Sequence, residues 1–400
     1  MHAPSVYHPF PVFSPIPEIL DDVRAGRFVV LLDAEDRENE GDLVLAAEHA
    51  TPERLNQMLR LAGGYLCLSL TPQDCDRLQL HPQSMHNTSV RGTPFTVSID
   101  GHPRHGVGTG VSAADRAATV LLAIDPTTGP EDFVRPGHIN PLRSREGGVL
   151  VRIGQTEGGV DLARLAGLHP SALIIEIVRE DGQMARRDDL AHLCSRHGLK
   201  ACTIDQLIEH RLQRERLVRR LEPASGSLIR TPFGAFTLFA YESVVDPLPH
   251  VALTMGGVGV PDASGRAPEQ AEPLLVRMHR RHLLGDIFCD LGSSPDGATR
   301  DALVASMEAV RRAGRGVIVY LRPQGQGDAL DQRLSRASGT SDVGVENTPR
   351  VPMHLREFGI GGQILRDLGV RRMRLLTNHP KSLPGLDAFG LEIVEQVGLG

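Results

Sequence analysis

Lysine is nearly absent from this chain of 400 residues. Only Lys200 and Lys381 occur, so the other 41 of the 43 basic residues are arginines. A catalytic Schiff base and the Gly-Lys pair of a nucleotide-binding P-loop both require lysine, and the sequence therefore argues against these two chemistries. The planar guanidinium of arginine instead favours two-pronged recognition of phosphate and carboxylate groups.

Long apolar runs, a secretory signal and a high cysteine count are also missing. The longest apolar runs, at 28–32, 65–70 and 120–124, are far shorter than the roughly 20 residues of a membrane-spanning helix. The N-terminus lacks a charged-then-apolar signal pattern, and five scattered cysteines are typical of a reduced protein. We therefore expect a cytoplasmic protein with no membrane partner.

The overall charge is weakly negative. Forty-nine acidic residues outnumber 43 basic ones, for a formal net charge of -6. Binding to nucleic acid needs a local excess of basic residues, so we expect no nucleic-acid partner. The hydrophobic fraction of 40% is ordinary for a globular protein, and the length predicts two or three domains.

Strand-like and helix-like segments alternate up to about residue 220, which indicates an α/β or α+β domain. Helical spacing of apolar residues predicts helices over 16–25, 52–61, 72–78, 112–122, 188–198 and 204–220. Thr51 and Ser112 are the expected N-caps of two of them. Strands are predicted over 28–32, 65–70, 95–99 and 173–178.

A boundary follows the Arg-rich stretch 211–220 and the turn-forming residues 222–227. We interpret Arg219 and Arg220 as a solvated helix face rather than a nucleic-acid patch. The predicted organisation is an N-terminal arm (1–13), a first domain (14–212), a linker (213–227) and a second domain (228–400). The second domain is predicted to hold strands over 235–240, 251–255, 274–278, 316–320 and 373–376, helices over 298–313 and 362–368, and a long loop over 324–347.

The richest segment for chemistry is Asp33–Asp42, which places six carboxylates within ten residues directly after an apolar strand. In an extended chain alternate side chains share one side. That side would carry Asp36, Glu38, Glu40 and Asp42, and Arg37 on the opposite side could take a phosphate. Four converging carboxylates repel one another unless a hard cation or a polyol uses them. An acidic surface turn is the alternative.

Other candidates lie further along the chain. The glycine-rich stretch 106–112 precedes a helix, where backbone amides can face an anion. His138 falls on a predicted turn, where a lone histidine is more often structural. Arg152 and Thr156 fall in a predicted loop. Glu176 lies inside an apolar strand, and a buried carboxylate needs a partner or an unusual pKa, which makes it the best general-base candidate.

The motifs of the first half occur in a specific order. They are Asp36-Arg-Glu-Asn-Glu-Gly-Asp42, His86-Asn-Thr88, Thr109-Gly-Val-Ser-Ala-Ala-Asp-Arg116, Arg135-Pro-Gly-His138, Gly147-Gly-Val-Leu150 and Asp181-Gly-Gln-Met-Ala185. Over residues 14–212 the chain resembles 3,4-dihydroxy-2-butanone 4-phosphate synthase of riboflavin biosynthesis. The resemblance implies an α+β fold, a homodimer with sites at the subunit interface, and conversion of ribulose 5-phosphate to formate and a four-carbon ketone phosphate.

The resemblance also implies roles for individual residues. His138 and Glu176 would be the acid/base pair, and Glu38 would hold Mg²⁺ or Mn²⁺. The substrate would be contacted by Arg37, Glu38, Glu40, Asp42, Arg152, Gln155, Thr156 and Glu176, with Arg152 and Thr156 at its phosphate end. The family has a metal-binding histidine where this chain has Gln155, whose amide oxygen is the ligand type that Mg²⁺ prefers.

The second half resembles GTP cyclohydrolase II through Arg277-Met-His279, Leu283-Leu-Gly-Asp286 and Leu355-Arg-Glu-Phe-Gly-Ile-Gly361. That family holds Zn²⁺ with three cysteine thiolates, and here His282 and Leu291 replace two of them beside Cys289. Further departures from the family pattern fall at His354, Phe358 and Ser382. We therefore expect neither Zn²⁺ nor GTP cyclohydrolase activity in this domain.

Two other readings of the whole chain stay open at this point. One is a non-catalytic regulator or scaffold in which both sites have decayed. The other is a related sugar-phosphate lyase with a different product, which Gln155 would permit.

Overall fold

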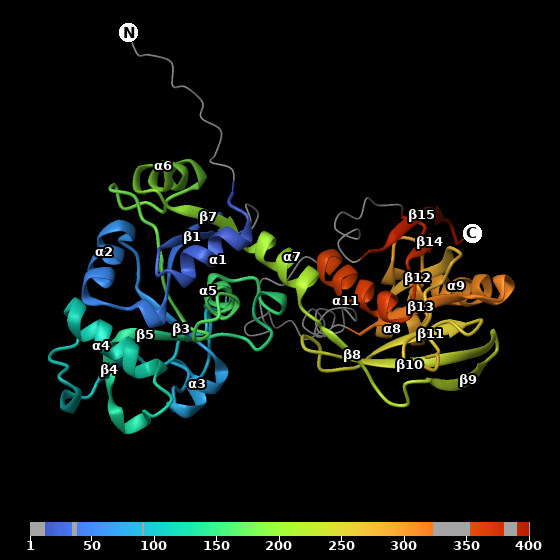
Figure 1. The fold of residues 1–400 in the computed structure, drawn as a ribbon, viewed down its shortest axis with the longest axis horizontal. Coiled ribbons are helices and arrows are strands. Elements are labelled where there is room, and N and C mark those ends of the chain that lie inside the picture. Colours follow the sequence, from blue (N-terminus) through green and yellow to red (C-terminus); the bar gives the residue numbers. More distant parts are fainter. Residues whose placement is uncertain (1–12, 34–37, 90–91, 323–352, 380–389, 400) are drawn as a thin grey trace, which may run out of the picture. The chain divides into compact units, whose positions relative to one another are not determined.

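The computed structural model describes residues 13–33, 38–89, 92–322, 353–379 and 390–399, apart from the side chains of 353–358. Two compact units make up the chain, the first ending at His210 and the second beginning at Arg211 (Figure 1). Each unit contains one mixed sheet covered by helices, which confirms the predicted α+β class.

The first unit is built on a seven-stranded sheet of order β4-β5-β3-β6-β2-β1-β7. Its strands are β1 (Val29–Leu32), β2 (Gly41–Ala46), β3 (Cys67–Leu70), β4 (Ile99–Gly101), β5 (Phe133–Arg143), β6 (Ala172–Glu176) and β7 (Lys200–Thr203). β3 runs parallel to β5 and β1 runs parallel to β7, whereas the other pairs are antiparallel. The carboxylate-bearing strands β2 and β6 are therefore central neighbours.

Seven helices accompany this sheet in the described part of the unit. They are α1 (Ile16–Arg24), α2 (Pro52–Ala62), α3 (Pro72–Arg77), α4 (Ala113–Ile124), α5 (Gln155–Leu165), α6 (Arg187–His197) and α7 (Ile204–Arg214). Leu43 and Ile175 on one face of the sheet pack in a single core with Met58 of α2 and Val120 of α4. As predicted, the hydroxyls of Thr51 and Ser112 cap α2 and α4.

The opposite face of the sheet is covered by α5, which approaches closely because it carries Gly158 and Gly159. A Cβ atom at Gly158 would lie only 2.4 Å from a methyl group of Leu31. At Gly159 the nearest side-chain atoms belong to Ala172 and Ile174 of β6. Side chains alternate along a strand, so Glu176 lies on the same face as Ala172 and Ile174. Helix α5 and Glu176 therefore share one face of the sheet.

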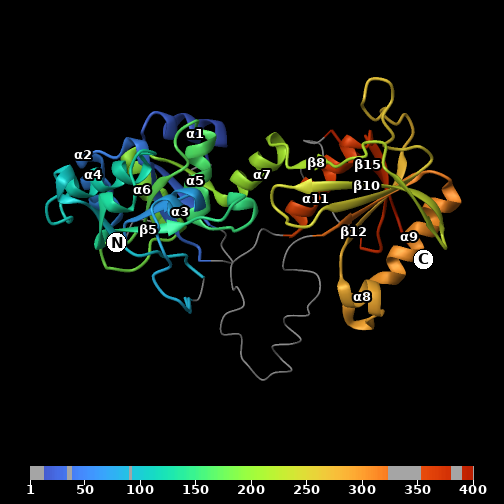
Figure 2. The same ribbon diagram turned by 90° about the horizontal axis from the view of Figure 1, so that it is seen from below.

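The second unit is built on an eight-stranded sheet of order β15-β14-β12-β13-β11-β10-β8, with β9 paired to β10. The strands are β8 (Val218–Arg220), β9 (Ser227–Thr231), β10 (Gly234–Ser243), β11 (His250–Met255), β12 (Leu274–Arg280), β13 (Gly316–Leu321), β14 (Arg372–Leu376) and β15 (Glu392–Val397). Its helices are α8 (Leu283–Phe288), α9 (Thr299–Ala313) and α11 (Met353–Asp367). Figure 2 shows α8 and α9 at one side of this sheet.

Several predicted boundaries differ from the structure. The predicted strand 95–99 forms only isolated bridges, and the regular strand β4 starts at Ile99. Strand β5 is absent from the predictions because Pro136, Gly137 and Pro141 interrupt any alternating pattern. The predicted helix 204–220 ends at Arg214. The predicted loop 324–347 lies outside the described residues.

Arg219 and Arg220 are not a helix face, and this interpretation is wrong. They belong to β8, a strand that lies inside the stretch predicted as a linker and pairs with β10. Arg219 forms an exposed ion pair with Glu242. The Arg220 guanidinium donates to Asp367 at 2.8 Å and lies 4.6 Å from the ring centroid of Phe239. Ion pairs and an aromatic face thus hold these charges on a strand.

All five cysteines are free thiols, of which four are buried and Cys289 is exposed. Within the described ranges, no helix has both the length and the apolar character needed to cross a membrane.

Candidate active site

Two carboxylates face each other across the central strands β2 and β6. Asp42 is the register partner of Glu176, and on its other side Asp42 pairs with Leu31 of β1. Register partners on neighbouring strands project to the same side, so both carboxylates lie on the face that α5 covers. Asp42 is buried and Glu176 is half-buried.

The electrostatics show that the neighbouring acids converge on this pair. Burial raises the pKa of Asp42 well above its usual value, and the charges of Glu176, Glu38, Asp33 and Glu40 raise it further. Burial likewise raises the pKa of Glu40, with Glu38 adding to the effect. The structure therefore brings together the predicted acids Glu38, Glu40, Asp42 and Glu176.

This convergence predicts that Asp42 costs stability. A carboxyl whose pKa is raised on folding stabilises the fold below its unfolded pKa, near 3.8, and that stability is lost as the pH rises through the folded pKa. Asp42→Asn never ionises, so we expect it to raise the free energy of unfolding at pH 7.5 by about 1 kcal/mol, a few degrees in Tm. The difference should vanish near pH 4. Thermal unfolding at both pH values checks this, and a less stable variant at pH 7.5 would contradict it.

The described part of the acidic segment before Gly41, residues 38–40, forms a turn, which is the alternative that the sequence left open to an extended chain. Asn39 has φ of 55°, in the left-handed region that asparagine tolerates. The carboxylate of Asp33 accepts hydrogen bonds from the amides of Glu38 (3.1 Å) and Glu40 (2.8 Å), which folds the segment back onto the end of β1. The predicted residues Asp36 and Arg37 lie outside the described residues.

Glu176 and Cys67 line the same part of the sheet. The Glu176 carboxylate accepts a hydrogen bond of 2.9 Å from the amide of Tyr65, just before β3. Cys67 is buried, and burial followed by the charges of Glu176 and Asp42 raises the pKa of its thiol. The thiol is therefore neutral at physiological pH, as expected of a structural cysteine.

His138 is held by Asp100, a residue that sequence reasoning missed. The Asp100 carboxylate accepts from the His138 backbone amide at 2.8 Å and lies 2.7 Å from its ring Nδ1. The register between β4 and β5 shifts beside Asp100, and such a bulge re-aims a side chain. The only signal in the sequence was that Asp100 directly follows the alternating stretch 95–99 and precedes Gly101. His138 itself is half-exposed on β5 and does not lie on the predicted turn.

The two predicted acid/base residues have separate partners. His138 belongs to β5 and Glu176 to β6, and β3 lies between these strands. Neighbouring strands are about 4.8 Å apart, so roughly 10 Å separates their backbones across the sheet. Within one chain, His138 contacts Asp100 whereas Glu176 contacts the amide of Tyr65.

Arg152, Gln155 and Thr156 mark the start of α5. The last two were predicted in a loop, but α5 begins at Gln155, and both are buried in its first turn. Arg152 forms a buried ion pair of 2.6 Å with Glu157, which also accepts from the amide of Arg145. Burial raises the pKa of Glu157, while Arg152 opposes that shift. A helix N-terminus beside an arginine suits an anionic group.

The glycine-rich stretch 106–112 serves the protein's own carboxylate. The amides of Gly108 and Gly110 donate to Asp115 at 2.9 and 3.1 Å, and these bonds lower the pKa of Asp115. The amides predicted to face a bound anion are therefore already engaged.

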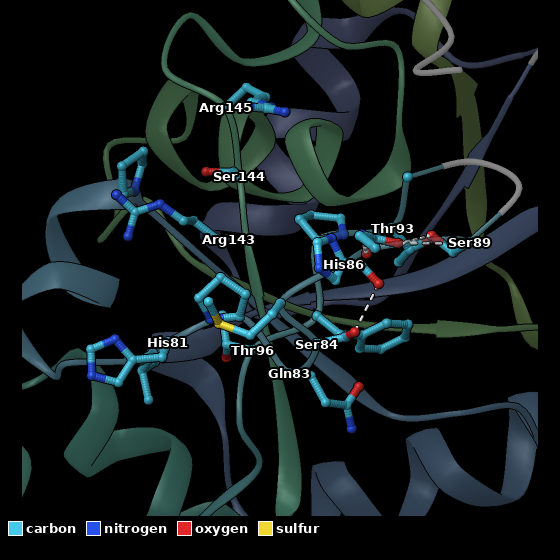
Figure 3. A pocket seen from close by; sticks show the side chains of 18 of the residues that line it. His81, Gln83, Ser84, His86, Ser89, Thr93, Thr96, Arg143, Ser144 and Arg145 are labelled. Atoms are coloured by element: carbon cyan, nitrogen blue, oxygen red, sulfur yellow. Dashed lines mark hydrogen bonds between the residues drawn. The ribbon is translucent and has the colours of Figure 1, made fainter. Parts of the chain in front are cut away.

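A cavity of about 800 Å³ lies elsewhere in the first unit (Figure 3). It is lined by residues of the segment 80–96 and by Arg143, Ser144 and Arg145. Arg143 forms an ion pair with Asp76 at 2.7 Å. None of the predicted site residues lines this cavity. The converging carboxylates, rather than the size of a cavity, therefore define the candidate active site.

In the second unit, the positions where the resemblance implies zinc-binding cysteines are either engaged in other contacts or exposed. His282 caps α8, its Nδ1 accepting from the amide of Gly285 at 3.0 Å. Cys289 is exposed and receives a hydrogen bond from Arg300, and the Leu291 side chain is 75% exposed. The described residues contain no group of three or more histidine, cysteine or acidic side chains arranged to hold a metal.

Two residues of the quoted motifs, His279 and Asp286, are hydrogen-bonded to each other in the second unit. The buried Asp286 carboxylate is 3.0 Å from His279 Nε2 and accepts from the hydroxyls of Thr299 and Tyr320, each at 2.6 Å. Burial alone would raise the pKa of Asp286, but these hydrogen bonds together lower it. The domain has kept its buried polar core around the altered positions.

Comparison with known proteins identifies the family of each half of the chain. Residues 17–210 match the 3,4-dihydroxy-2-butanone 4-phosphate synthase family, and residues 223–398 match the GTP cyclohydrolase II family. A riboflavin biosynthesis protein RibBA from Aquifex aeolicus (strain VF5) is 45% identical over 394 residues, which cover 96% of this chain and 92% of the relative. The chain belongs to the RibBA family. A RibBA protein from Rhodococcus jostii (strain RHA1) is 44% identical and covers 97% of this chain and 91% of its own length.

One solved structure matches this chain over both of its units. The crystal structure of RibBX, described as a two-domain 3,4-dihydroxy-2-butanone 4-phosphate synthase from A. baumannii, is 36% identical with a TM-score of 0.75. It covers 96% of this chain and 99% of its own. A further structure, of a 3,4-dihydroxy-2-butanone 4-phosphate synthase in complex with two magnesium ions, is 43% identical, covers 50% of this chain and 96% of its own, and has a TM-score of 0.48.

Proposed function

We propose that the first unit converts D-ribulose 5-phosphate to 3,4-dihydroxy-2-butanone 4-phosphate and formate. The observation that carries the proposal is the pairing of Asp42 with Glu176 across β2 and β6, with Glu38 and Glu40 close enough for their charges to raise the pKa of Asp42. Such a cluster is costly to the fold and is retained where a cation or polyol uses it. The start of α5, with Arg152 and Thr156, supplies the phosphate end.

The proposed reaction begins with proton abstraction beside the substrate carbonyl, which forms an enediol. Glu176 and His138 are the proton carriers in the proposal, because each has an oriented acid/base atom. The Asp100 carboxylate orients the His138 ring through Nδ1, which leaves Nε2 for the substrate. Asp42 and Glu40 accept hydrogen bonds from substrate hydroxyls.

The donor set suits a divalent cation such as Mg²⁺ or Mn²⁺. Glu38 supplies a carboxylate oxygen and Gln155 an amide oxygen, and Mg²⁺ prefers oxygen ligands and retains several waters or substrate oxygens. Burial is the main reason that the pKa values of Asp42 and Glu40 are raised, and the neighbouring carboxylates raise them further, an effect that a bound cation would oppose. When bound, the metal stabilises the enediolate charge on vicinal oxygens.

Incubation of the full chain with ribulose 5-phosphate and Mg²⁺ tests this function. We expect stoichiometric release of formate and the four-carbon ketone phosphate, identified by mass spectrometry. Consumption of substrate with a different product would favour the related lyase. Binding without any turnover, or no binding, would favour the regulator or scaffold.

We also propose that the second unit has no GTP cyclohydrolase activity. The proposal is supported by His282, whose Nδ1 is occupied in a helix cap, and by Leu291, which cannot ligate a metal. Zinc catalysis of this type needs three protein ligands around an open position. The departures at His354, Phe358 and Ser382 point the same way, although these side chains lie outside the described residues.

Pure protein incubated with GTP should therefore form no diaminopyrimidine product, with or without added Zn²⁺. Metal analysis should find less than one zinc per chain. Because Zn²⁺-dependent water activation requires the missing thiolates, restoring Cys at positions 282 and 291 together is the informative gain-of-function control. Product formation by the unaltered protein would overturn the proposal.

A homodimer of the first unit is the proposed assembly, with its sites at the interface. The half-exposed His138 and its roughly 10 Å separation from Glu176 across the sheet support a site completed by a second copy. Light scattering of the full chain should give twice the mass of one chain. A monomer at micromolar concentration would contradict this.

A further inference from the structure

One arginine lies directly against the acidic turn and has no role so far. The guanidinium Nη1 of Arg186 donates to the backbone carbonyls of Glu38 at 2.5 Å and Asn39 at 3.0 Å, and it lies 3.4 Å from a carboxylate oxygen of Glu40. The same turn is held from its other side by Asp33, which accepts from the amides of Glu38 and Glu40. Asp33 thus binds amides of the turn, and Arg186 binds its carbonyls.

Arg186 is itself placed firmly, at the point where the chain enters α6. Its backbone amide donates to Asp189 at 3.0 Å, which caps the helix. The preceding hairpin is closed by a hydrogen bond of 2.9 Å from the amide of Ala185 to the carbonyl of Ile177. The segment that leaves β6 therefore begins at Glu176 and ends at Arg186. Glu176 lies beside Asp42, and Arg186 binds the Glu38–Glu40 turn.

We propose that Arg186 is a positioning residue that holds the Glu38–Glu40 turn ready for the metal before the metal binds. This inference rests on the proposed function, because Glu38 is the proposed metal ligand. Without the guanidinium, two carbonyls lose their donor and the left-handed turn at Asn39 loses a restraint. The Glu38 carboxylate would then be spread over many orientations, and metal binding would have to order it.

Position and charge make opposite predictions here, which allows a sharp test. The Arg186 charge repels a nearby cation, so if charge were its only contribution, Arg186→Gln would bind metal more tightly and Arg186→Lys would behave like the wild type. If position matters, both variants bind more weakly. Both carbonyls accept from the one Nη1 atom, and a lysine ammonium also has enough N–H donors for two carbonyls. Its side chain is shorter and lacks the rigid planar group that fixes Nη1, so Arg186→Lys should fall between the wild type and Arg186→Gln.

The experiment titrates the metal-free full chain with Mn²⁺ alone and follows free Mn²⁺ by electron paramagnetic resonance. We expect about tenfold weaker binding for Arg186→Gln, the usual size of an effect from groups that support a metal ligand. Hydrogen exchange of the metal-free protein should be faster at the amides of Glu38 and Glu40. Arg179 is unsuitable as a control because it also lies 3.7 Å from Asp189, the carboxylate that binds the Arg186 amide. Arg219→Gln, which removes an arginine from an exposed ion pair with Glu242 in the second unit, is the matched control.

Turnover supplies a second readout that a loss of folding would not produce. The kcat of Arg186→Gln should be reduced at low Mg²⁺ and largely restored at high Mg²⁺, with thermal unfolding close to that of Arg219→Gln. Unchanged or tighter Mn²⁺ binding together with unchanged exchange in Arg186→Gln overturns the positioning role. If the wild type shows no turnover but the Mn²⁺ and exchange results hold, the proposed function fails and the positioning role stands.

Discussion

Replacing Glu38 with alanine is expected to abolish formate release from ribulose 5-phosphate. Charge stabilisation by a bound metal contributes several kcal/mol to such a transition state, so we expect a loss of about 10³-fold or more. Glu180→Ala is the matched control, because it removes an exposed carboxylate from the hairpin after β6 without touching the cluster. Steady-state rates across a Mg²⁺ titration measure the effect.

The same titration distinguishes the contribution of Gln155. An amide offers one neutral oxygen and can turn to present its N–H₂ group, whereas imidazole is a directional ligand. We expect Gln155→His to tighten the metal and raise turnover, provided that the buried first turn of α5 accommodates the ring. If Gln155→His changes neither the Mg²⁺ dependence nor the rate, and Glu38→Ala is harmless, the metal-assisted mechanism is wrong. The regulator reading would then replace it.

The second large effect is expected at His138 and Asp100. A positioned general acid or base contributes roughly 10² to 10⁴ in rate, so His138→Ala should lose about that factor in kcat. Asp100→Asn keeps the shape of the side chain but offers the ring an N–H₂ group where Nδ1–H needs an acceptor. The ring then loses its tautomer and orientation, and we expect a loss of about 10²-fold or more, as in other histidine–aspartate pairs.

A second aspartate–histidine pair in the same unit provides the control for that experiment. Asp132 lies 2.7 Å from His105 Nε2 and also binds Arg104, outside the carboxylate cluster. Asp132→Asn should leave kcat within about twofold for the folded fraction, since neither Asp132 nor His105 belongs to the proposed site. Equal losses in both asparagine variants would show a general effect of folding and remove Asp100 from the proposed mechanism.

Local sequence patterns predicted the parts of the fold that depend on neighbouring residues. The cap residues Thr51 and Ser112 start α2 and α4 as expected, because their hydroxyls bind amides only three positions away. The apolar strands at 28–32 and 173–178 correspond to β1 and β6. The order of motifs also indicated the right families for both halves, and comparison with RibBA proteins confirms it.

Long-range contacts decided what the patterns could not. Asp100 meets His138 because of a bulge between β4 and β5, and no spacing along the chain encodes a pairing over 38 positions. Arg186 meets Glu38 across 148 positions, a contact that likewise no spacing along the chain encodes. The sequence left open whether the acidic segment is extended or a turn, and Asp33 decides for a turn at residues 38–40 by accepting two amides.

The sequence by itself determined which residue types are available: an acidic segment after a buried strand, few lysines, and altered zinc positions at His282 and Leu291. Only the tertiary structure decided which of these meet. The register of β2 on β6 places Asp42 beside Glu176. Gln155 is buried at the start of α5, the helix that covers the same face of the sheet. The physical reason is that hydrophobic burial of the strands sets the register, and polar side chains are then brought together wherever that register places them.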